Sequence, residues 1–351
     1  MLDNVAFPNE AWLLPCNDLE AQMLMKRRDL LSLFSGPIVL GTCGFQARAA
    51  LPRSKARIGF ITALDQPAAA EFIDAFVEGL AVLGYQSSAF ELKPLFANYQ
   101  PERIPSFVEK LNKDDVDVII THGNATGQVI KNPHNAPIVY EFSADPITLG
   151  FASDLAHPLY NATGVTLMMA ELNTKRLELL NEMLPEARRI AVMGNPLHAG
   201  MQSEWTHSET QARKLKIDVV FCPTPNRKEL ENAFVSIQEN RPQAMLVFSD
   251  SFIVQNRTDI IDFAMKQRIP VIDGWSVMAE AGALCTYGPR LSESYRRVAY
   301  FVDRILKGAK AADLPIEQPA VLELVINLKT ANALGIAIPQ NVLVRADKVI
   351  E

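Results

Sequence analysis

Cysteine is scarce in this sequence, with four residues in 351 and no Cys-x-x-Cys pair. So few and so widely spaced cysteines exclude a disulfide-built scaffold and give no indication of a zinc site. A surplus of basic residues is also lacking, because 34 Lys and Arg stand against 40 Asp and Glu and the net charge is −6. Such a chain has no broad surface that neutralises phosphates, so we expect no nucleic-acid partner.

The usual catalytic and cofactor-binding motifs are absent as well. No Gly-x-Gly-x-x-Gly follows the first apolar segment at 57–61, so a dinucleotide cannot approach the chain closely there. The sequence has no Walker A motif, no Gly-x-Ser-x-Gly elbow and no His-Glu-x-x-His, and no two of its five histidines are four residues apart. We therefore predict that the protein is not an enzyme and that it uses no metal and no cofactor.

The N-terminal region differs from the rest of the chain. Lys26-Arg27-Arg28 precede a short apolar stretch that ends at Ala47-Arg48-Ala49, which is the pattern of a cleavable export signal. The paired arginines resemble a twin-arginine signal, but Lys26 stands where Ser or Thr is usual, so the ordinary secretion route stays open. We predict an export signal peptide over 25–49.

Residues 1–24 contain acidic but no basic side chains, which does not suit the start of an export signal. We interpret them as an extension ahead of a true start at Met25 or Met23, with a genuine cytoplasmic arm as the alternative. Cys43 follows Leu-Gly-Thr, a poor match to a lipoprotein site, so lipid attachment is the less favoured outcome. Beyond residue 60 no apolar run approaches the roughly 18 residues of a membrane span. We predict a protein exported to the periplasm.

From residue 57 onward, short β-branched segments alternate with longer amphipathic ones. This order is typical of parallel sheets with helices on both faces. The alternation pauses after Asp145-Pro146 and then resumes, which indicates two successive open α/β sheets and therefore two lobes with a cleft between them. The predicted boundaries are 55–143 plus 288–320 for the first lobe, and 147–285 plus 321–351 for the second lobe with the hinge and the C-terminal tail.

Open α/β sheets bind ligands outside the carboxyl ends of their strands, so the residues that follow each strand form the candidate site. Hydroxyl and backbone N–H groups there suit a carboxylate, a carboxylate suits an ammonium group, and an aromatic face suits an apolar group or a cation. The candidate ligand-binding residues are Thr62, His122, Asn124, Phe142 and Ser143 in the first lobe, and Asn195, Asp250 and Trp275 in the second.

Most of these candidates also have a purely structural interpretation. Asp250 could cap a helix, His122 could be a buried structural histidine, and Phe142 and Trp275 could fill the hinge region. As ligand contacts, we expect Asp250 to hold an ammonium group and Phe142 with Trp275 to hold an apolar or aromatic side chain. Hydroxyl and backbone N–H groups would hold a carboxylate.

The segment ILKGAKAADLPIEQP at 305–319 resembles a signature of one group of ABC-transporter substrate-binding proteins. The segments LVINLKTA at 324–331, NATGVT at 161–166 and KRLELL at 175–180 look like landmarks of the same family. The resemblance covers about residues 55–351. It implies an α/β type I periplasmic-binding-protein fold, in which two doubly wound parallel-sheet lobes are joined by a three-strand hinge.

The same resemblance implies an exported solute receptor that closes on a small organic solute and delivers it to an ABC permease in the inner membrane. The tryptophan- and aromatic-amino-acid-binding-like members suggest an aromatic or branched-chain amino acid as the solute. The loop at 121–124 departs from the family pattern, at a place where specificity is set. We expect a monomer. The alternative is a periplasmic ligand-sensing module that serves a signalling receptor.

Overall fold

The structure is a computed structural model, and it describes residues 55–351. The predicted extension at 1–24, the predicted export signal at 25–49 and Cys43 all lie outside the described residues. No helix within the described part of the chain is long and apolar enough to cross a membrane.

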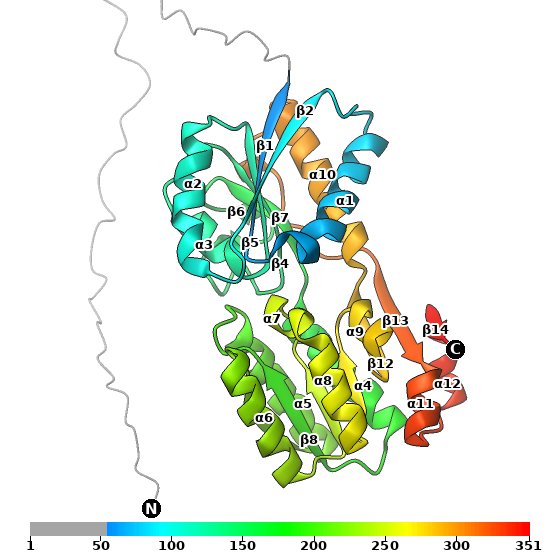
Figure 1. Ribbon diagram of the computed structural model, residues 1–351. Coiled ribbons are helices and arrows are strands. Elements are labelled where there is room, and N and C mark those ends of the chain that lie inside the picture. The colour runs from blue at the N-terminus through cyan, green and yellow to red at the C-terminus, as the bar shows by residue number, and fades with distance from the viewer. Residues whose placement is uncertain (1–54) are drawn as a thin grey trace, which may run out of the picture. The chain divides into compact units, whose positions relative to one another are not determined.

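The first lobe is built on a five-stranded sheet whose strands all run parallel, in the order β2-β1-β3-β4-β7 (Figure 1). Its inner strands are almost continuously apolar because helices cover both faces. A short antiparallel pair, β5 (Ala152–Asp154) with β6 (His157–Pro158), precedes the last strand. The strands of the sheet are β1 (Ala56–Thr62), β2 (Phe90–Phe96), β3 (Val118–His122), β4 (Ile138–Phe142) and β7 (Ala162–Thr166).

Helices lie on both faces of this first sheet. The first helix begins after Asp65, whose carboxylate accepts a hydrogen bond of 3.0 Å from the Ala68 amide and so caps the helix. The first and last of these helices, α1 and α10, pack together on one face, and α2 and α3 lie on the other (Figure 1). The helices are α1 (Gln66–Val82), η1 (Pro101–Arg103), α2 (Ile104–Lys113), η2 (Gly123–Ala125), α3 (Thr126–Lys131), α10 (Leu291–Leu306) and η3 (Ala311–Asp313).

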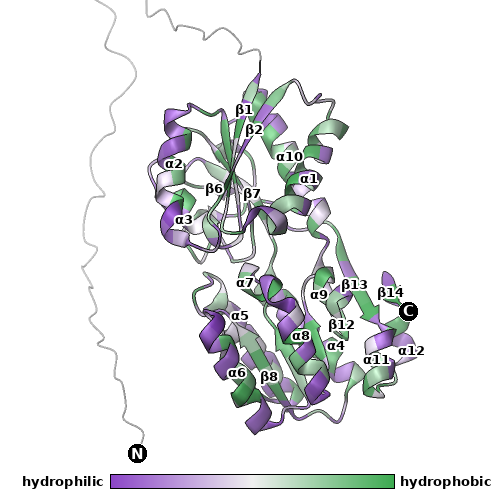
Figure 2. Ribbon diagram, in the orientation of Figure 1, coloured by the Kyte–Doolittle hydropathy of each residue, from purple (hydrophilic) through white to green (hydrophobic). Residues whose placement is uncertain are grey.

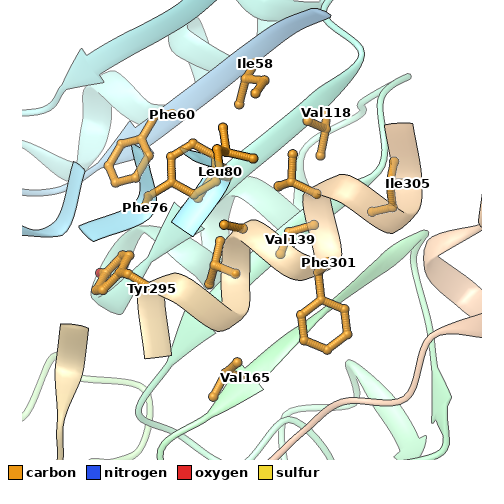
Figure 3. Close-up of a cluster of buried hydrophobic side chains, with 14 of the residues drawn as sticks. Ile58, Phe60, Phe76, Leu80, Val118, Val139, Val165, Tyr295, Phe301 and Ile305 are labelled. Carbon is orange, nitrogen blue, oxygen red and sulfur yellow. The ribbon is translucent and has the colours of Figure 1, made fainter. Parts of the chain in front are cut away.

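Alternation along the strands decides which side chains meet which helices, because successive residues face opposite sides of a sheet. Phe60, Val139 and Val165 face α1 and α10 and pack in one buried cluster with Tyr295 of α10, as Figure 3 shows. Tyr140, the residue after Val139, packs instead in the cluster on the α2 and α3 face. The same alternation determines which residues at the strand ends reach the cleft.

The second lobe is built on a seven-stranded sheet in the order β14-β13-β12-β11-β10-β8-β9. Every neighbouring pair is parallel except β12 with β13. Figure 2 shows the apolar residues concentrated in the strands, whereas outer helices such as α8 (Arg257–Gln267) carry many hydrophilic residues. The strands are β8 (Arg189–Gly194), β9 (Asp218–Pro223), β10 (Ala244–Val247), β11 (Val271–Asp273), β12 (Cys285–Pro289), β13 (Leu322–Asn327) and β14 (Lys348–Ile350).

Two groups of helices cover the two faces of the second sheet. On one face α4, α5, α11 and α12 enclose a core, and on the other face α6, α7, α8 and α9 enclose another. The helices are α4 (Met169–Met183), α5 (Met201–Leu215), α6 (Arg227–Asn240), α7 (Ser251–Gln255), α8 (Arg257–Gln267), α9 (Ser276–Ala281), α11 (Leu328–Leu334) and α12 (Gln340–Leu343).

Within residues 55–351 the chain passes between the two lobes three times. The passages lead from β7 to α4, from β12 to α10 and from η3 to β13. Two parallel-sheet lobes with three connections confirm the predicted type I periplasmic-binding-protein architecture.

The predicted boundary between the lobes is wrong in one place. Residues from 147 were assigned to the second lobe, but β7 pairs in parallel with β4 and completes the first sheet. This strand has little apolar bulk, and at Gly164 an added Cβ would lie 1.9 Å from the carbonyl oxygen of Tyr140. A strand with a glycine at its centre has only a weak strand pattern in its sequence. Here the close approach of β4 requires that glycine.

Candidate ligand-binding site

A cavity lies between the two lobes, at the carboxyl ends of strands from both sheets. With the walls in contact, the free volume of the cavity is about 30 Å³. Five of the eight predicted residues line it: His122, Asn124, Ser143, Asp250 and Trp275. The other lining residues are Leu64, Ala68, Phe72, Gly123, Glu141, Leu167, Leu291 and Tyr295 from the first lobe, and His198, Ser251 and Val254 from the second.

A larger hollow of about 450 Å³ lies away from the cleft, beside α1 and α10. Its two arginines are already paired, because Arg297 binds Glu317 at 2.5 Å and Arg296 binds Glu293 at 2.6 Å. The interlobe cavity, in contrast, contains buried polar atoms without partners. We therefore place the candidate site in the interlobe cavity.

The two lobes touch each other across this cavity. The Ser143 hydroxyl lies 2.6 Å from Nε2 of His198, and the Asn124 amide donates to Oδ2 of Asp250 over 3.4 Å. Each of these pairs joins a residue after a strand of the first sheet to a residue of the second lobe. The structure therefore shows the cleft with its walls in contact.

Thr62 is fully buried beneath the cavity and does not line it. Its hydroxyl accepts a hydrogen bond of 3.0 Å from the Leu64 amide and lies 2.6 Å from Nε2 of His122. Burial lowers the pKa of His122 from 6.5 to about 4, so the ring is uncharged at neutral pH. Thr62 therefore positions His122, and His122 presents an uncharged ring to the cavity.

Phe142 does not line the cavity, contrary to the prediction. Its fully buried ring packs beside Tyr140 and Phe151, with centroid distances of 6.3 and 6.1 Å, in the core on the α2 and α3 face. Because side chains alternate along β4, the residue that reaches the cavity is its neighbour Glu141. The aromatic wall on the first lobe comes from Phe72 of α1 instead.

Asp250 caps a helix, which was one of its two interpretations, and its side chain also lines the cavity. Its Oδ1 accepts from the Ile253 amide at 2.8 Å and caps α7, while its Oδ2 accepts from the Asn195 side-chain amide at 2.7 Å. Asn195 is buried behind Asp250 and does not line the cavity. Burial raises the pKa of Asp250, and His198 and these hydrogen bonds oppose that rise in part.

Trp275 lines the second-lobe wall as predicted, at the start of α9. Its backbone amide donates to Oδ1 of Asp273 over 2.8 Å, which fixes the turn after β11. Its indole Nε1 is buried and has no hydrogen-bond partner. The residue therefore gives the cavity wall an apolar surface and carries a buried donor without a partner.

His198 is a cavity residue that the sequence analysis did not select. Its Nδ1 lies 3.3 Å from Oε1 of Glu204 and 3.2 Å from the Gly200 amide nitrogen. When Nδ1 carries no proton it accepts a hydrogen bond from the Gly200 amide, and when it is protonated it donates to the Glu204 carboxylate instead. Burial by itself lowers the pKa of His198, but Glu204 and Asp250 raise it above 6.5 in balance. His198 follows β8 in a loop, as the predicted residues do, and that position was the available signal.

Glu141 and Tyr295 are two further cavity residues that the sequence analysis missed. Glu141 is the one charged residue in the otherwise apolar strand IVYEF, and this contrast was a usable signal. Tyr295 lies on α10, about 150 residues further along the chain. Burial raises the pKa of Glu141 to about 8, and the Tyr295 hydroxyl partly lowers it although the two groups form no hydrogen bond of normal geometry.

The described residues offer no set of metal ligands. Within 55–351, no three His, Cys, Asp or Glu side chains converge as a metal site would require. Cys222 and Cys285 are both buried as free thiols, and burial raises their pKa values to about 11 and about 12. Two lobes with three connections around a polar and aromatic cavity define a solute-binding protein of the type I periplasmic-binding fold.

The sequence family agrees with this class. A family model described as ABC transporter substrate binding protein matches residues 57–350. The chain belongs to the family of ABC transporter substrate-binding proteins, which bind small molecules and deliver them to ABC permeases. No curated protein sequence matches the chain.

Solved structures show the same fold. A domain from Streptococcus pneumoniae in complex with L-Trp is 22% identical with a TM-score of 0.79, over 85% of this chain and 100% of that one. A conserved domain protein from Vibrio cholerae is 24% identical with a TM-score of 0.76, over 84% and 99%. A solute-binding protein from Agrobacterium vitis with bound allitol is 14% identical with a TM-score of 0.58, over 83% and 97%.

Proposed function

We propose that the protein is an exported receptor that binds an amino acid with an aromatic or branched side chain and passes it to the permease of an ABC importer. One observation carries the proposal: a single buried cavity combines an acidic group, a basic group and aromatic walls. Asp250 is the acidic group, His198 is the basic group, and Phe72 and Trp275 provide the aromatic walls.

The second lobe suits the charged part of a free amino acid. Three of the roughly four acceptor positions of the Asp250 carboxylate are occupied by Ile253, Asn195 and Asn124, which leaves one for an ammonium group. His198 lies beside Ser143 at the cavity wall, and its protonated ring would hold the carboxylate. A zwitterion therefore finds a partner of opposite charge for each end.

The walls of the cavity suit an apolar side chain. Phe72, Leu64 and Leu167 line it from the first lobe, and Val254 and Trp275 line it from the second. Removing an apolar side chain from water contributes about 25 cal/mol for each Å² that is buried. The structure from S. pneumoniae was obtained with L-Trp, which supports an aromatic amino acid, whereas the one from A. vitis contains allitol.

Lobe closure is the proposed mechanism of delivery. Ser143 and His198 meet across the cavity, so a solute held by both lobes stabilises the closed state over the open one. The permease would then recognise the closed protein. We further propose that the protein acts in the periplasm as a monomer.

The test is a thermal-shift screen of the whole protein against amino acids, polyols, sugars, purines and small carboxylates. A solute that binds only the folded state stabilises it by about 2.7 kcal/mol at a hundredfold excess over its Kd. We expect shifts with aromatic or branched-chain amino acids. Shifts with polyols or sugars alone would overturn the proposed solute class and keep the receptor role.

A further inference from the structure

One acidic side chain in the cavity is placed on the apolar face of the first sheet. The strand register sets Glu141 of β4 beside His122 of β3 and Val165 of β7, and all three face α1 and α10. Glu141 is only 4% exposed, yet it lines the cavity. A carboxyl group at the end of an apolar cluster is costly unless something binds it.

One oxygen of this carboxyl group has no hydrogen bond of normal geometry, although the Tyr295 hydroxyl lies close enough to lower the pKa of Glu141 in part. The buried Oε1 of Glu141 has no hydrogen-bond partner, and neither does the buried hydroxyl of Tyr295 that faces it. The other carboxylate that lines the cavity, Asp250, is in contrast held by Asn195 and by the Ile253 amide. No lysine or arginine lines the cavity. Glu141 and Tyr295 both line the interlobe cavity, so a solute held there lies beside these two unpaired polar atoms.

Aromatic rings surround this polar end. Tyr295 stacks on Phe72 with centroids 4.9 Å apart and an interplanar angle of 16°. His122 meets the edges of both rings, at 5.3 Å from Phe72 and 5.8 Å from Tyr295. Such walls accept a planar or apolar group, while the carboxyl oxygen beyond them accepts a hydrogen bond.

We propose that Glu141 and Tyr295 form a specificity subsite for a hydrogen-bond donor at the far end of the solute's side chain. The inference rests on the proposed function and narrows it: the solute is an indole- or phenol-type amino acid, and hydrocarbon side chains such as those of phenylalanine and leucine bind less well. Glu141 accepts the N–H or O–H of the solute. Asp250, on the opposite lobe, takes the ammonium end.

The balance of donors and acceptors favours this assignment. Oε1 of Glu141 accepts a hydrogen bond whether or not the other oxygen carries a proton, and the Tyr295 hydroxyl can either donate or accept. A hydrocarbon side chain would leave both groups buried and unpaired in the closed state, which weakens its binding. A solute with a donor forms a hydrogen bond to Glu141 when the cleft closes.

The experiment compares solutes that differ in this donor alone. Calorimetric titrations of the whole protein use tryptophan against its benzothiophene analogue, in which sulfur replaces the indole N–H, and tyrosine against phenylalanine. We expect the donor-bearing member of at least one pair to bind about 10- to 100-fold more tightly. Glu141→Leu should abolish that preference, and Glu141→Gln, which keeps an acceptor oxygen, should retain most of it.

A matched control is the buried acid Asp303 on α10, which binds Tyr85 and Lys307 outside the cavity. Asp303→Asn should leave the preference unchanged. Equal affinities within both pairs in the unmodified protein would overturn the subsite and keep the amino-acid receptor. Absence of binding by all four solutes would overturn the subsite together with the aromatic part of the proposed solute class. The comparison in the unmodified protein holds even where Glu141→Leu fails to fold.

Discussion

Replacing Asp250 with Asn separates its two roles. The substitution keeps the shape of the side chain and one carbonyl oxygen that can cap α7 at Ile253, but it removes the negative charge that faces the cavity. A hydrogen bond to a charged group contributes about 1.5 to 3 kcal/mol, so Kd for an amino acid should rise about 10- to 150-fold. The free energy of unfolding should fall by about 1 to 3 kcal/mol, because the cap is kept but the Asn195 amide loses its acceptor.

Asp250→Ala cannot separate the two roles. It removes the cap, at about 1 kcal/mol, and leaves the Asn195 amide without its buried partner, at about 1 to 3 kcal/mol more. Calorimetry with the best amino acid and with its analogue that lacks the amino group gives the decisive comparison. Asp250→Asn should raise the Kd of the amino acid and leave the Kd of the analogue unchanged. An equal loss for both solutes would refute an ammonium contact at Asp250.

Two further predictions concern residues of the first lobe. Because the Phe142 ring lies in the core, Phe142→Leu should lower the free energy of unfolding by about 1 kcal/mol and leave Kd unchanged, and a weaker Kd without any loss of stability would contradict this. Burial lowers the pKa of His122 from 6.5 to about 4, so the unfolded chain takes up this proton first as the pH falls. Between pH 6.5 and about pH 4 the free energy of unfolding should therefore fall by about 1.4 kcal/mol per pH unit. Denaturant titrations at several pH values should show a shallower dependence of this free energy on pH for His122→Gln than for the unmodified protein.

The fold was largely predictable from the sequence because alternation of strands and helices is a local pattern. The strands β3 and β4 belong to the predicted alternation, and such strands can be recognised because buried parallel strands are apolar along nearly their whole length. The strand β7 was missed, because a small, glycine-containing segment is a strand only through its pairing with β4. That pairing depends on tertiary contacts, which no local pattern records.

The candidate site was predictable in position and only in part in composition. The rule that ligands lie at the carboxyl ends of strands selects Asp250 and Trp275, and both line the cavity. The same rule does not determine on which face of the sheet Phe142 lies, since one step along a strand reverses the face. Tyr295 comes from α10, after the chain has returned from the second lobe, so its neighbourhood with Glu141 is invisible in the sequence. Thr62 and Asn195 were selected as contacts, and the structure places them behind the residues that line the cavity.

We propose that the solute enters the interlobe cavity, and the fluorescence of Trp275 should report its binding there. Trp275 lines the cavity, whereas Trp205 packs against Phe221 in the second lobe with centroids 5.3 Å apart. Titration with an amino acid that lacks tryptophan fluorescence should change the emission of the protein saturably. We expect Trp205→Phe to keep this change and Trp275→Phe to lose it. A change that persists in Trp275→Phe and disappears in Trp205→Phe would place the solute outside the interlobe cavity.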